Sequence, residues 1–435
     1  MRIASKIFLA MCIAAMPLVL GAADWPQWRG PNRDGISKET GLLKKWPKAG
    51  PQLLWTFDKA GTGYSAPAIV GGKVYTMGAR DKTEYVIALN SKGKELWSAK
   101  IAPLFDFKGN NWSGGPNGTP TIDGDVLYAL GSQGELVCLE LAGGKLLWHK
   151  NMPKDFGGQV SGVGGGPENM GWGYAWSPLV DGDKLICVPG GPQGLLAALD
   201  KKTGEVKWRS KDVKDRATYS SPIMATIGGV KQYIQLTQDG VVGIAADTGE
   251  LVWSYKRANP YPDVVCPTPL VKGDMVYVTA GWGGGAELLK IEPDGKKFKA
   301  TSVWSEKEIG NRHGGVVLIG KYVYGCHEDR AWACQDFAEG GENKWDPSRN
   351  ALGAGSVGSI LYADERLYCV AEKNKIGVVG MLEANPEKYT EISRFTLPQA
   401  SKLRKNRGGV WTHPVISDGL LYVRDQELLF CYKVK

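Results

Sequence analysis

Aromatic and basic side chains in the predicted connections of this chain could bind a flat or anionic ligand. Aromatic faces stack on flat molecules, and arginine makes paired hydrogen bonds to carboxylates and phosphates. Packing between loops would explain several of these side chains equally well, namely Trp176, Arg312, His313 and Trp411. The candidate ligand-binding residues are Tyr64, Trp112, Trp176, Arg312, His313, Arg407, Trp411 and His413.

Catalysis and metal binding have little support in the sequence. The chain has four histidines, and their positions show no metal-ligand spacing. No nucleophile with a base partner can be identified. His149 is expected to be exposed, whereas His313 and His413 could approach each other at one end of the predicted fold. We therefore predict no catalytic residues and no metal site.

Evenly spaced tryptophans indicate the framework that positions these side chains. Each interval is long enough for about four short strands, the size of one propeller blade. The sequence therefore predicts an all-β fold, an eight-bladed β-propeller of four-stranded antiparallel blades. Each tryptophan would dock on the neighbouring blade, with its indole N–H bound to a backbone acceptor. The docking tryptophans are Trp55, Trp97, Trp148, Trp208, Trp253, Trp304 and Trp345, and Phe395 stands at the eighth position.

A second repeat predicts the inner strands of each blade. In five units a proline stands eight positions before a strand residue, as Pro67 stands before Tyr75. Proline lacks a backbone N–H, so the first residue of a strand tolerates it best. A Gly-Gly or Asp-Gly turn lies between the two positions, as at Gly71-Gly72. This pattern is typical of a β-hairpin.

The two ends of the chain are predicted to meet in one blade. The segment from Pro414 onward supplies only three strands, whereas Leu53–Phe57 has the pattern of the missing fourth strand. We therefore expect the N-terminal strand to close the last blade, which leaves no open sheet edge at the seam. Deletion of residues 51–58 should then destabilise the whole protein.

Small and hydroxylated residues directly precede the innermost strands and would surround one end of the central channel. We expect their hydroxyl groups mainly to bind water and backbone atoms. Longer connections would bring the candidate ligand-binding residues to the same end. The residues of this ring are Ala66, Thr119, Ser177, Ser221, Thr268, Gly315, Ser359 and His413.

The first 23 residues have the features of a secretory signal peptide. Arg2 and Lys6 precede an apolar run over residues 7–20, and small residues follow. The run is short for a membrane span, so we predict cleavage and an exported, periplasmic or extracellular protein without a transmembrane segment. A less favoured alternative is lipidation at Cys12. Residues 24–435 are predicted to form a single propeller domain.

Charge and cysteine content set further expectations. The formal net charge is +8, and the basic stretch 402–407 could meet an anionic ligand or a membrane surface, although a solvated loop explains it more simply. Nucleic-acid binding has no further support. Cys326 and Cys334 flank a tight turn and could form a disulfide. The other cysteines of the mature chain are expected to be buried singly in strands.

A repeated Asp-x-x-Thr-Gly-x-x-x-x-Trp pattern is complete at 200–208 and partial at 248–253. It resembles the tryptophan-docking repeat of the pyrroloquinoline-quinone (PQQ) propeller superfamily, and the resemblance covers nearly all of the mature chain. The resemblance implies one of two functions: a periplasmic quinoprotein dehydrogenase, or a non-enzymatic protein like the outer-membrane-protein assembly lipoprotein and many secreted PQQ-like repeat proteins. The opening stretch 25–35 is similar to the mature start of this last group.

The dehydrogenase alternative needs a quinone, a Ca²⁺ ion bound by carboxylate and amide oxygens, and an acidic base. Its nearest candidates are Glu168, Asn169, Asp263 and Arg312, and the three oxygen-bearing residues lie in no motif that matches. We therefore predict a monomeric, non-enzymatic scaffold without a cofactor. Its partner would be a cell-envelope protein, an extended peptide or a small ligand in the channel mouth. The alternative is a PQQ- and Ca²⁺-dependent periplasmic dehydrogenase of alcohols or sugars.

Overall fold

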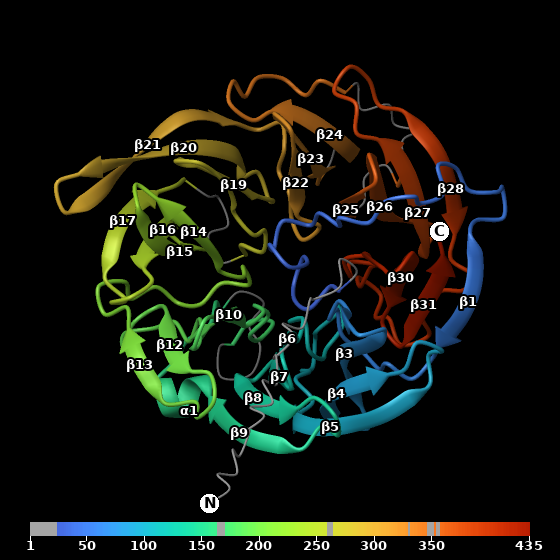
Figure 1. Cartoon of the computed structure of the whole chain (residues 1–435), viewed down its shortest axis with the longest axis horizontal. Helices are drawn as coiled ribbons and strands as arrows, with labels where there is room; N and C mark the ends of the chain where they lie inside the picture. Colours follow the sequence, from blue (N-terminus) through green and yellow to red (C-terminus); the bar gives the residue numbers. More distant parts are fainter. Residues whose placement is uncertain (1–23, 163–169, 259–263, 329–330, 346–351, 354–356) are drawn as a thin grey trace, which may run out of the picture.

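The chain forms an eight-bladed β-propeller, as the sequence predicts (Figure 1). The computed structural model describes residues 24–435 except 163–169, 259–263, 329–330, 346–351 and 354–356. Within the described residues, 31 strands form eight antiparallel sheets around a central channel. The first strand of each sheet lies nearest to the channel.

Blades one to four follow one another along the chain, with four strands each. Blade one contains β2 (Ala68–Val70), β3 (Lys73–Arg80), β4 (Thr83–Leu89) and β5 (Glu95–Pro103). Blade two contains β6 (Thr121–Asp123), β7 (Val126–Leu130), β8 (Glu135–Glu140) and β9 (Leu146–Asn151). Blade three contains β10 (Leu179–Asp181), β11 (Lys184–Cys187), β12 (Ala197–Asp200) and β13 (Val206–Arg209). Blade four contains β14 (Ile223–Ile227), β15 (Val230–Leu236), β16 (Gly240–Ala245) and β17 (Leu251–Lys256).

Blades five to eight complete the ring. Blade five contains β18 (Leu270–Lys272), β19 (Met275–Ala280), β20 (Gly285–Asp294) and β21 (Lys297–Glu306). Blade six contains β22 (Val316–Ile319), β23 (Tyr322–His327) and β24 (Ala331–Asp336). Blade seven contains β25 (Ser359–Ala363), β26 (Arg366–Lys373), β27 (Ile376–Glu383) and β28 (Glu391–Thr396). Blade eight contains β29 (Val415–Ser417), β30 (Leu420–Asp425), β31 (Leu428–Lys433) and β1 (Gln52–Phe57).

Helix is nearly absent from the described part of the chain. The short helix α1 (Met152–Phe156) follows β9, and the side chain of Asn151 caps its first turn. No helix among the described residues has the length and apolar character needed to cross a membrane. The predicted signal peptide, residues 1–23, lies outside the described residues.

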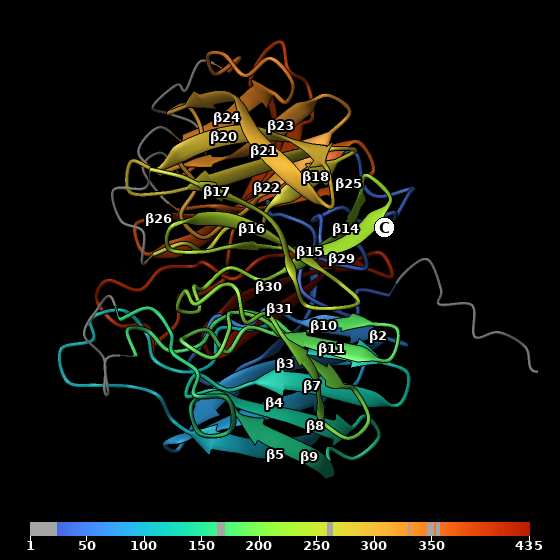
Figure 2. The same cartoon turned by 90° about the vertical axis from the view of Figure 1, so that its left-hand side faces the viewer.

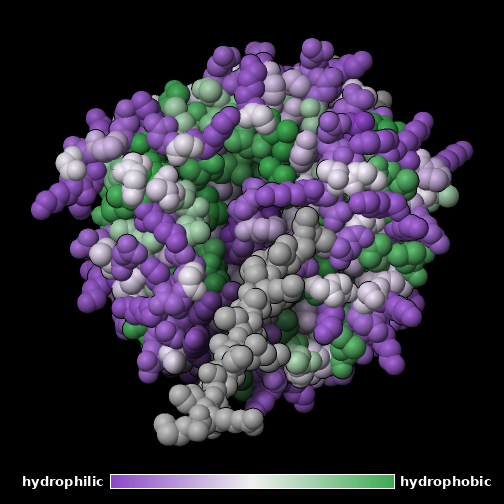
Figure 3. Space-filling view, viewed as in Figure 1, coloured by the Kyte–Doolittle hydropathy of each residue, from purple (hydrophilic) through white to green (hydrophobic). Residues whose placement is uncertain are grey.

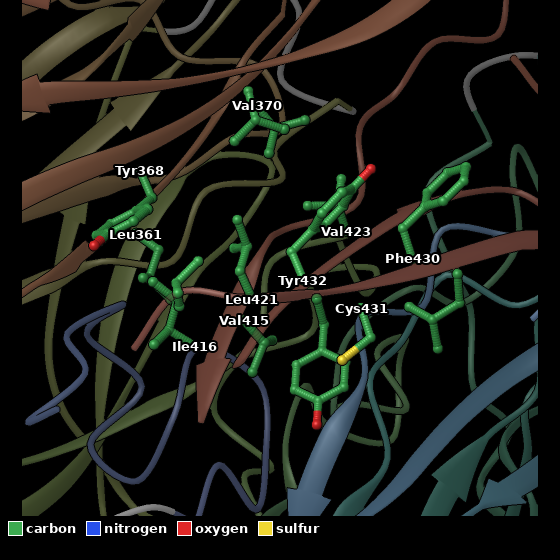
Figure 4. Close-up of a cluster of buried hydrophobic side chains, with 14 of the residues drawn as sticks. Leu361, Tyr368, Val370, Val415, Ile416, Leu421, Val423, Phe430, Cys431 and Tyr432 are labelled. Carbon is green, nitrogen blue, oxygen red and sulfur yellow. The ribbon is translucent and has the colours of Figure 1, made fainter. Parts of the chain in front are cut away.

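The predicted closure of the ring is confirmed. Strand β1 pairs antiparallel with β31, and Trp55 lies opposite Cys431. Buried side chains of blades seven and eight, including Tyr368, Val415 and Phe430, form one hydrophobic cluster at this seam (Figure 4). The two ends of the propeller therefore share both a sheet and a core.

The docking tryptophans pack on glycines of the next blade. An added Cβ at Gly249 would lie 2.4 Å from the Trp208 ring, and the φ angle of Gly249 is +77°. Glycine is favoured here because it leaves room for the ring and adopts positive φ at little cost. The indole N–H of Trp208 donates to the Ala246 carbonyl at 3.2 Å. The same packing joins Trp55 to Gly93, Trp97 to Gly144, Trp148 to Gly204, Trp304 to Gly340 and Phe395 to Gly50.

A β-bulge accompanies the docking contact and re-aims the side chains of the outer strand. In blade three, Ala198 pairs with Trp208 and Leu199 with Val206, so Lys207 is the extra residue. In blade two the corresponding residue is Leu147, which is 50% exposed, while the next residue, Trp148, packs on the neighbouring blade. The bulge therefore turns the tryptophan inward and its predecessor toward solvent.

Two tryptophans differ from the prediction. The indole N–H of Trp253 donates at 2.6 Å to the Gln232 side chain of its own blade, not to the backbone of blade five. Blade five carries the long hairpin β20–β21, which extends beyond the ring (Figure 1), and an added Cβ at its Gly295 turn would meet nothing within 4 Å. Trp345 lies beyond β24 without a fourth strand in the described residues, yet its N–H reaches the Asn385 carbonyl at 2.7 Å.

The predicted disulfide between Cys326 and Cys334 is wrong, because all seven described cysteines are free thiols. Cys326 pairs with Trp332, and Cys334 pairs with Tyr324, so the two thiols occupy diagonal positions on β23 and β24. Diagonal neighbours lie about 7 Å apart. A disulfide requires Cβ atoms about 4 Å apart, so this register excludes it.

A non-repeated N-terminal segment fills the channel. We call residues 25–37 the N-terminal plug, and Figure 1 shows this segment in blue across the centre of the ring. The plug hydrogen-bonds to residues on or shortly before the first strand of all eight blades. Its partners, from blade one to blade eight, are Ile69, Ile122, Pro178, Pro222, Thr268, Val316, Tyr362 and Ile416.

The two ends of the channel differ. The hairpin turns between first and second strands lie at one end, where Asp24 accepts a hydrogen bond from Gly71 and Glu39 accepts one from Asp418. The long connections that lead into the first strands lie at the other end, on the left of Figure 2. The outer rim of the ring is largely hydrophilic (Figure 3). The plug therefore leaves the loop-rich end open as a blind cavity.

Candidate functional site

The loop-rich end of the channel contains a cavity of about 470 Å³. Its walls come from the connections that enter the first strands of several blades, and its floor includes the N-terminal plug. Most of the lining is aromatic or small. The lining residues are Trp28, Tyr64, Trp112, Ser113, Asn117, Trp172, Ala175, Ser177, Tyr219, Ser221, Val264, Cys266, Trp282, Arg312, His313, Val357, Trp411 and His413.

One wall is a continuous stack of rings. Trp411 lies between Tyr64 and His313, with ring centroids 5.0 and 4.8 Å away and nearly parallel planes. The edge of the stack continues from His313 to Trp282, at 5.7 Å in a T-shaped arrangement. Because each ring fixes its neighbour, this wall presents a preformed aromatic surface.

The facing wall contains Trp112, Trp172 and Tyr219. Trp112 and Trp172 meet edge to face at 5.4 Å, and the Trp172 backbone N–H donates to the Tyr219 hydroxyl at 3.3 Å. The exposed guanidinium group of Arg407 lies 5.5 Å from the centre of the Trp112 ring. Arg407 therefore covers the outer side of this wall at the rim and does not line the cavity.

The floor joins the plug to blade eight. The Trp28 ring packs against His413 at 4.5 Å, and its indole N–H donates to the Thr268 hydroxyl at 2.9 Å. His413 in turn contacts the carbonyl oxygen of His313 at 3.0 Å. That oxygen can only accept, so the Nε2 atom of His413 carries the proton. The two histidines thus approach each other, as the sequence suggested.

A buried ion pair holds the one charged side chain of the described lining. Arg312 donates from Nε to Glu328 at 2.6 Å, and its guanidinium group lies 4.9 Å from the Trp282 ring centre. Glu328 also accepts backbone hydrogen bonds from Trp282 and Gly283. Burial works to raise the pKa of Glu328, but these three hydrogen bonds outweigh burial and lower it. Glu328 therefore remains a carboxylate that fixes Arg312.

Trp282 has an unusual backbone conformation. Its φ angle is +52°, in the left-handed region that non-glycine residues rarely adopt. The hydrogen bond from its N–H to Glu328 holds the turn in place. Such strain is maintained only where surrounding contacts fix it, and it commonly marks ligand-binding sites. The ring of Trp282 is therefore placed in the cavity at a cost in backbone energy.

The histidines of the cavity are unsuited to acid–base catalysis at neutral pH. Burial and the nearby charge of Arg312 lower the pKa of His313 to about 4. Burial and the charge of Arg29 lower the pKa of His413 to about 3. Both rings are therefore neutral near pH 7, and no carboxylate belongs to the described lining.

The predicted hydroxyl ring is mainly structural. The Ser177 hydroxyl accepts from the Thr119 backbone N–H at 2.9 Å, and the Ser221 hydroxyl accepts from the Ser177 N–H at 3.0 Å. Ser359 donates to the Thr412 carbonyl at 3.1 Å. These bonds link adjacent blades around the channel mouth, as expected for hydroxyls that satisfy backbone groups.

Six of the eight candidate residues line the cavity: Tyr64, Trp112, Arg312, His313, Trp411 and His413. Trp176 does not. Its neighbours Ala175 and Ser177 face the cavity, whereas the Trp176 side chain is fully buried in the hydrophobic cluster of blades two and three. The backbone here is extended, so alternate residues point in opposite directions.

The sequence prediction missed Trp28, Tyr219 and Trp282. Trp28 belongs to the opening motif at 25–35, whose separation from the repeats could have marked it as a channel element. Tyr219 lies shortly before Pro222, which begins an inner strand, so its position could have suggested the loop-rich end. Trp282 offered one signal, its place among the glycines of Gly281-Trp282-Gly283-Gly284.

The basic stretch 402–407 is mostly neutralised. Arg404 pairs with Glu372 and Asp425, and Lys405 pairs with Asp106 at 2.6 Å. Lys405 also donates to the Asn110 carbonyl, which ties this stretch to the connection that carries Trp112. The stretch therefore organises the cavity rim rather than forming an open anionic-ligand or membrane site.

The quinone and Ca²⁺ alternative can be tested against the donors present. Calcium needs several oxygen ligands that include carboxylates, and the described lining offers neutral oxygens such as those of Asn117 and Ser113. These donors do not fit a Ca²⁺ site. Glu168, Asn169 and Asp263 lie outside the described residues. The cofactor alternative thus remains a prediction without support from the described cavity.

Comparison with known proteins places the chain in a family. A family model described as outer membrane protein assembly factor BamB matches residues 82–346, more than half of the chain. The chain belongs to this family. BamB from Alkalilimnicola ehrlichii is 23% identical over 231 residues, 53% of this chain. The match spans 52% of that relative, so the chain covers about half the length of the curated BamB that it matches.

Solved structures agree on the fold. BamB from Moraxella catarrhalis has a TM-score of 0.59 at 15% identity, covering 89% of this chain and 98% of its own. Quinohemoprotein alcohol dehydrogenase from Comamonas testosteroni also has a TM-score of 0.59, at 13% identity, covering 95% of this chain and 80% of its own. Both BamB and dehydrogenase propellers therefore share this fold, and fold alone does not choose between their functions.

Proposed function

We propose that this protein is an exported, non-enzymatic binding propeller that engages a cell-envelope protein at its loop-rich end. The observation that carries the proposal is the preformed cavity, where aromatic rings predominate and neither histidine is poised for proton transfer. Buried aromatic side chains are typical anchors of protein interfaces. Membership in the BamB family supports a partner among proteins of outer membrane assembly.

Export rests on the sequence of residues 1–23, and binding rests on the cavity. In this proposal, a loop or extended segment of the partner inserts an apolar side chain between the two aromatic walls. The rim around Arg407 and Lys405 would add polar contacts. The fixed stack through Trp411 would lower the entropic cost of binding, because its rings are already ordered.

Affinity capture tests this proposal. Tagged mature protein would be incubated with detergent-solubilised envelopes of the source organism, beside the variants Trp411→Ala and Leu147→Ala. We expect the wild type and Leu147→Ala to retain an outer membrane assembly protein, and Trp411→Ala to lose it. Capture that is unaffected by Trp411→Ala would contradict the role of the cavity. Oxidation of an alcohol or sugar with PQQ and Ca²⁺ would instead favour the dehydrogenase.

A further inference from the structure

The N-terminal plug supplies more than closure of the channel. It places Trp28 in the cavity, and it also buries two arginines directly beneath the floor. Arg29 donates to the Val316 and Asp34 carbonyls, and Arg33 donates to the Pro222 carbonyl at 2.8 Å and the Ser177 carbonyl at 3.1 Å. Ser177 itself lines the cavity.

These arginines remain charged near pH 7. Burial lowers the pKa of Arg29 to about 10 and that of Arg33 to about 9, so both still hold their protons. The side chains bonded to them supply carbonyl and amide oxygens, and Asp34 is the acidic residue that interacts with Arg29. Their positive charge therefore adds to that of Arg312 on a cavity without a carboxylate in its described lining.

The walls select for shape. The stack through Trp411 faces the pair Trp112 and Trp172 across the cavity, and Trp28 closes the bottom. A flat ring can contact such faces over both of its sides. Because Glu328 accepts from Nε of Arg312, the two terminal amino groups of that arginine remain as donors to an acidic group.

We propose that the cavity binds a planar aromatic anion and that the N-terminal plug forms half of this site. The ligand ring lies between the aromatic walls above Trp28, and its acidic group is bound by Arg312 in the field of Arg29 and Arg33. This inference names a ligand class for the cavity assigned to partner binding under the proposed function. A ligand of this class could also be the part of a partner that inserts.

A matched pair of probes tests the charge requirement. Mature protein would be titrated calorimetrically with 2-naphthoate and with 2-naphthamide, its neutral counterpart of nearly the same shape. We expect 2-naphthoate to bind at least about tenfold more tightly, the effect of one charge-assisted hydrogen bond. Equal affinity for the two probes, or no binding of either, would overturn the proposal. The envelope capture is unaffected by this result, so the two proposals fail separately.

Variants test the two named contacts. Arg312→Gln should weaken 2-naphthoate about tenfold and leave 2-naphthamide unchanged, and Arg312→Lys should restore part of the loss. Trp28→Ala should weaken both probes, and Trp28→Phe should recover most of the affinity because it keeps a ring above the plug. Arg394→Gln, at an exposed pair with Glu391, is the control and should change neither affinity. Thermal unfolding would establish that each variant is folded, and a folded Arg312→Gln with wild-type binding would contradict the assignment.

Discussion

The outer ring and the central channel of this propeller are built in opposite ways. The ring repeats one contact, an aromatic side chain on a positive-φ glycine of the next blade, from Trp55 to Phe395. The channel is filled once, by a plug that bonds to all eight blades and occurs nowhere else in the chain. Repetition provides the framework, and the unique segment provides the site. Each region can be broken separately.

Loss of the closing strand should have the largest effect. Deletion of residues 51–58 removes β1, exposes the edge of β31 and opens the core of blades seven and eight. We expect the loss to exceed most of the roughly 5–15 kcal/mol that holds a typical domain, so cooperative unfolding should disappear. Replacing the exposed tip 294–297 of the protruding hairpin with Asn-Gly is the control. Circular dichroism melts that look alike for the two variants would contradict closure by β1.

Breaking one docking contact should cost less. Trp208→Ala removes the ring that packs on Gly249 and the hydrogen bond to the Ala246 carbonyl. We expect a loss of about 3–5 kcal/mol in the free energy of unfolding, typical of a large aromatic residue replaced by alanine. Leu147→Ala, at an exposed bulge position, should stay within about 0.5 kcal/mol. Urea titrations measure both, and a small effect at Trp208 would show that the ring does not depend on docking.

The plug should contribute to stability through its buried arginine. Arg33→Met keeps much of the apolar stem but leaves the Pro222, Ser177 and Pro178 carbonyls without their donor. We expect a loss of about 2–4 kcal/mol in the same urea titrations, since each unsatisfied buried group costs about 1–3 kcal/mol. Lys38→Met, exposed on the same segment, is the matched control. Equal stability of the two variants would mean that the plug only rests in the channel.

A buried carboxyl group between blades one and two gives the smallest effect and a pH signature. Glu84 accepts backbone hydrogen bonds from Ser132 and Phe105, and burial raises its pKa to about 7. The folded state therefore binds this proton more tightly than the unfolded state, so stability falls as the pH rises from about 4.5 to about 7. A shift of this size is worth up to about 3 kcal/mol.

The variant Glu84→Gln isolates this group. The difference in unfolding free energy between wild type and variant should change in favour of the variant from pH 4.5 to pH 7 and stay constant above pH 8. Denaturant titrations at several pH values give this difference directly. A difference that does not change with pH would show that Glu84 titrates at its ordinary pKa in the folded protein.

The sequence predicted the ring because the ring is periodic. Tryptophan spacing, the inner-strand prolines and the orphan strand at Leu53–Phe57 gave the blades and the seam. Deviations occurred where the repeat itself changes. The longer hairpin of blade five removes the expected partner of Trp253, and the register of β23 and β24 separates Cys326 from Cys334.

The site was less predictable because it depends on side-chain direction and on long-range contacts. Residues that directly precede inner strands could be placed at the channel end, which found His413 and the connections around Trp411. Whether Trp176 or its neighbours face the cavity depends on one residue of register. Trp28 reaches the cavity only because the plug enters the channel from the opposite end, and no local pattern shows this.

Site-specific photo-crosslinking tests the central claim, partner binding at the loop-rich end, most directly. A benzophenone side chain would replace Arg407 at the cavity rim or Asp274 in the exposed turn between β18 and β19 at the opposite end. After irradiation with cell envelopes, we predict that a discrete outer membrane assembly protein is crosslinked from position 407 and not from position 274. Crosslinking only from position 274 would place the partner at the plug entrance and contradict the account.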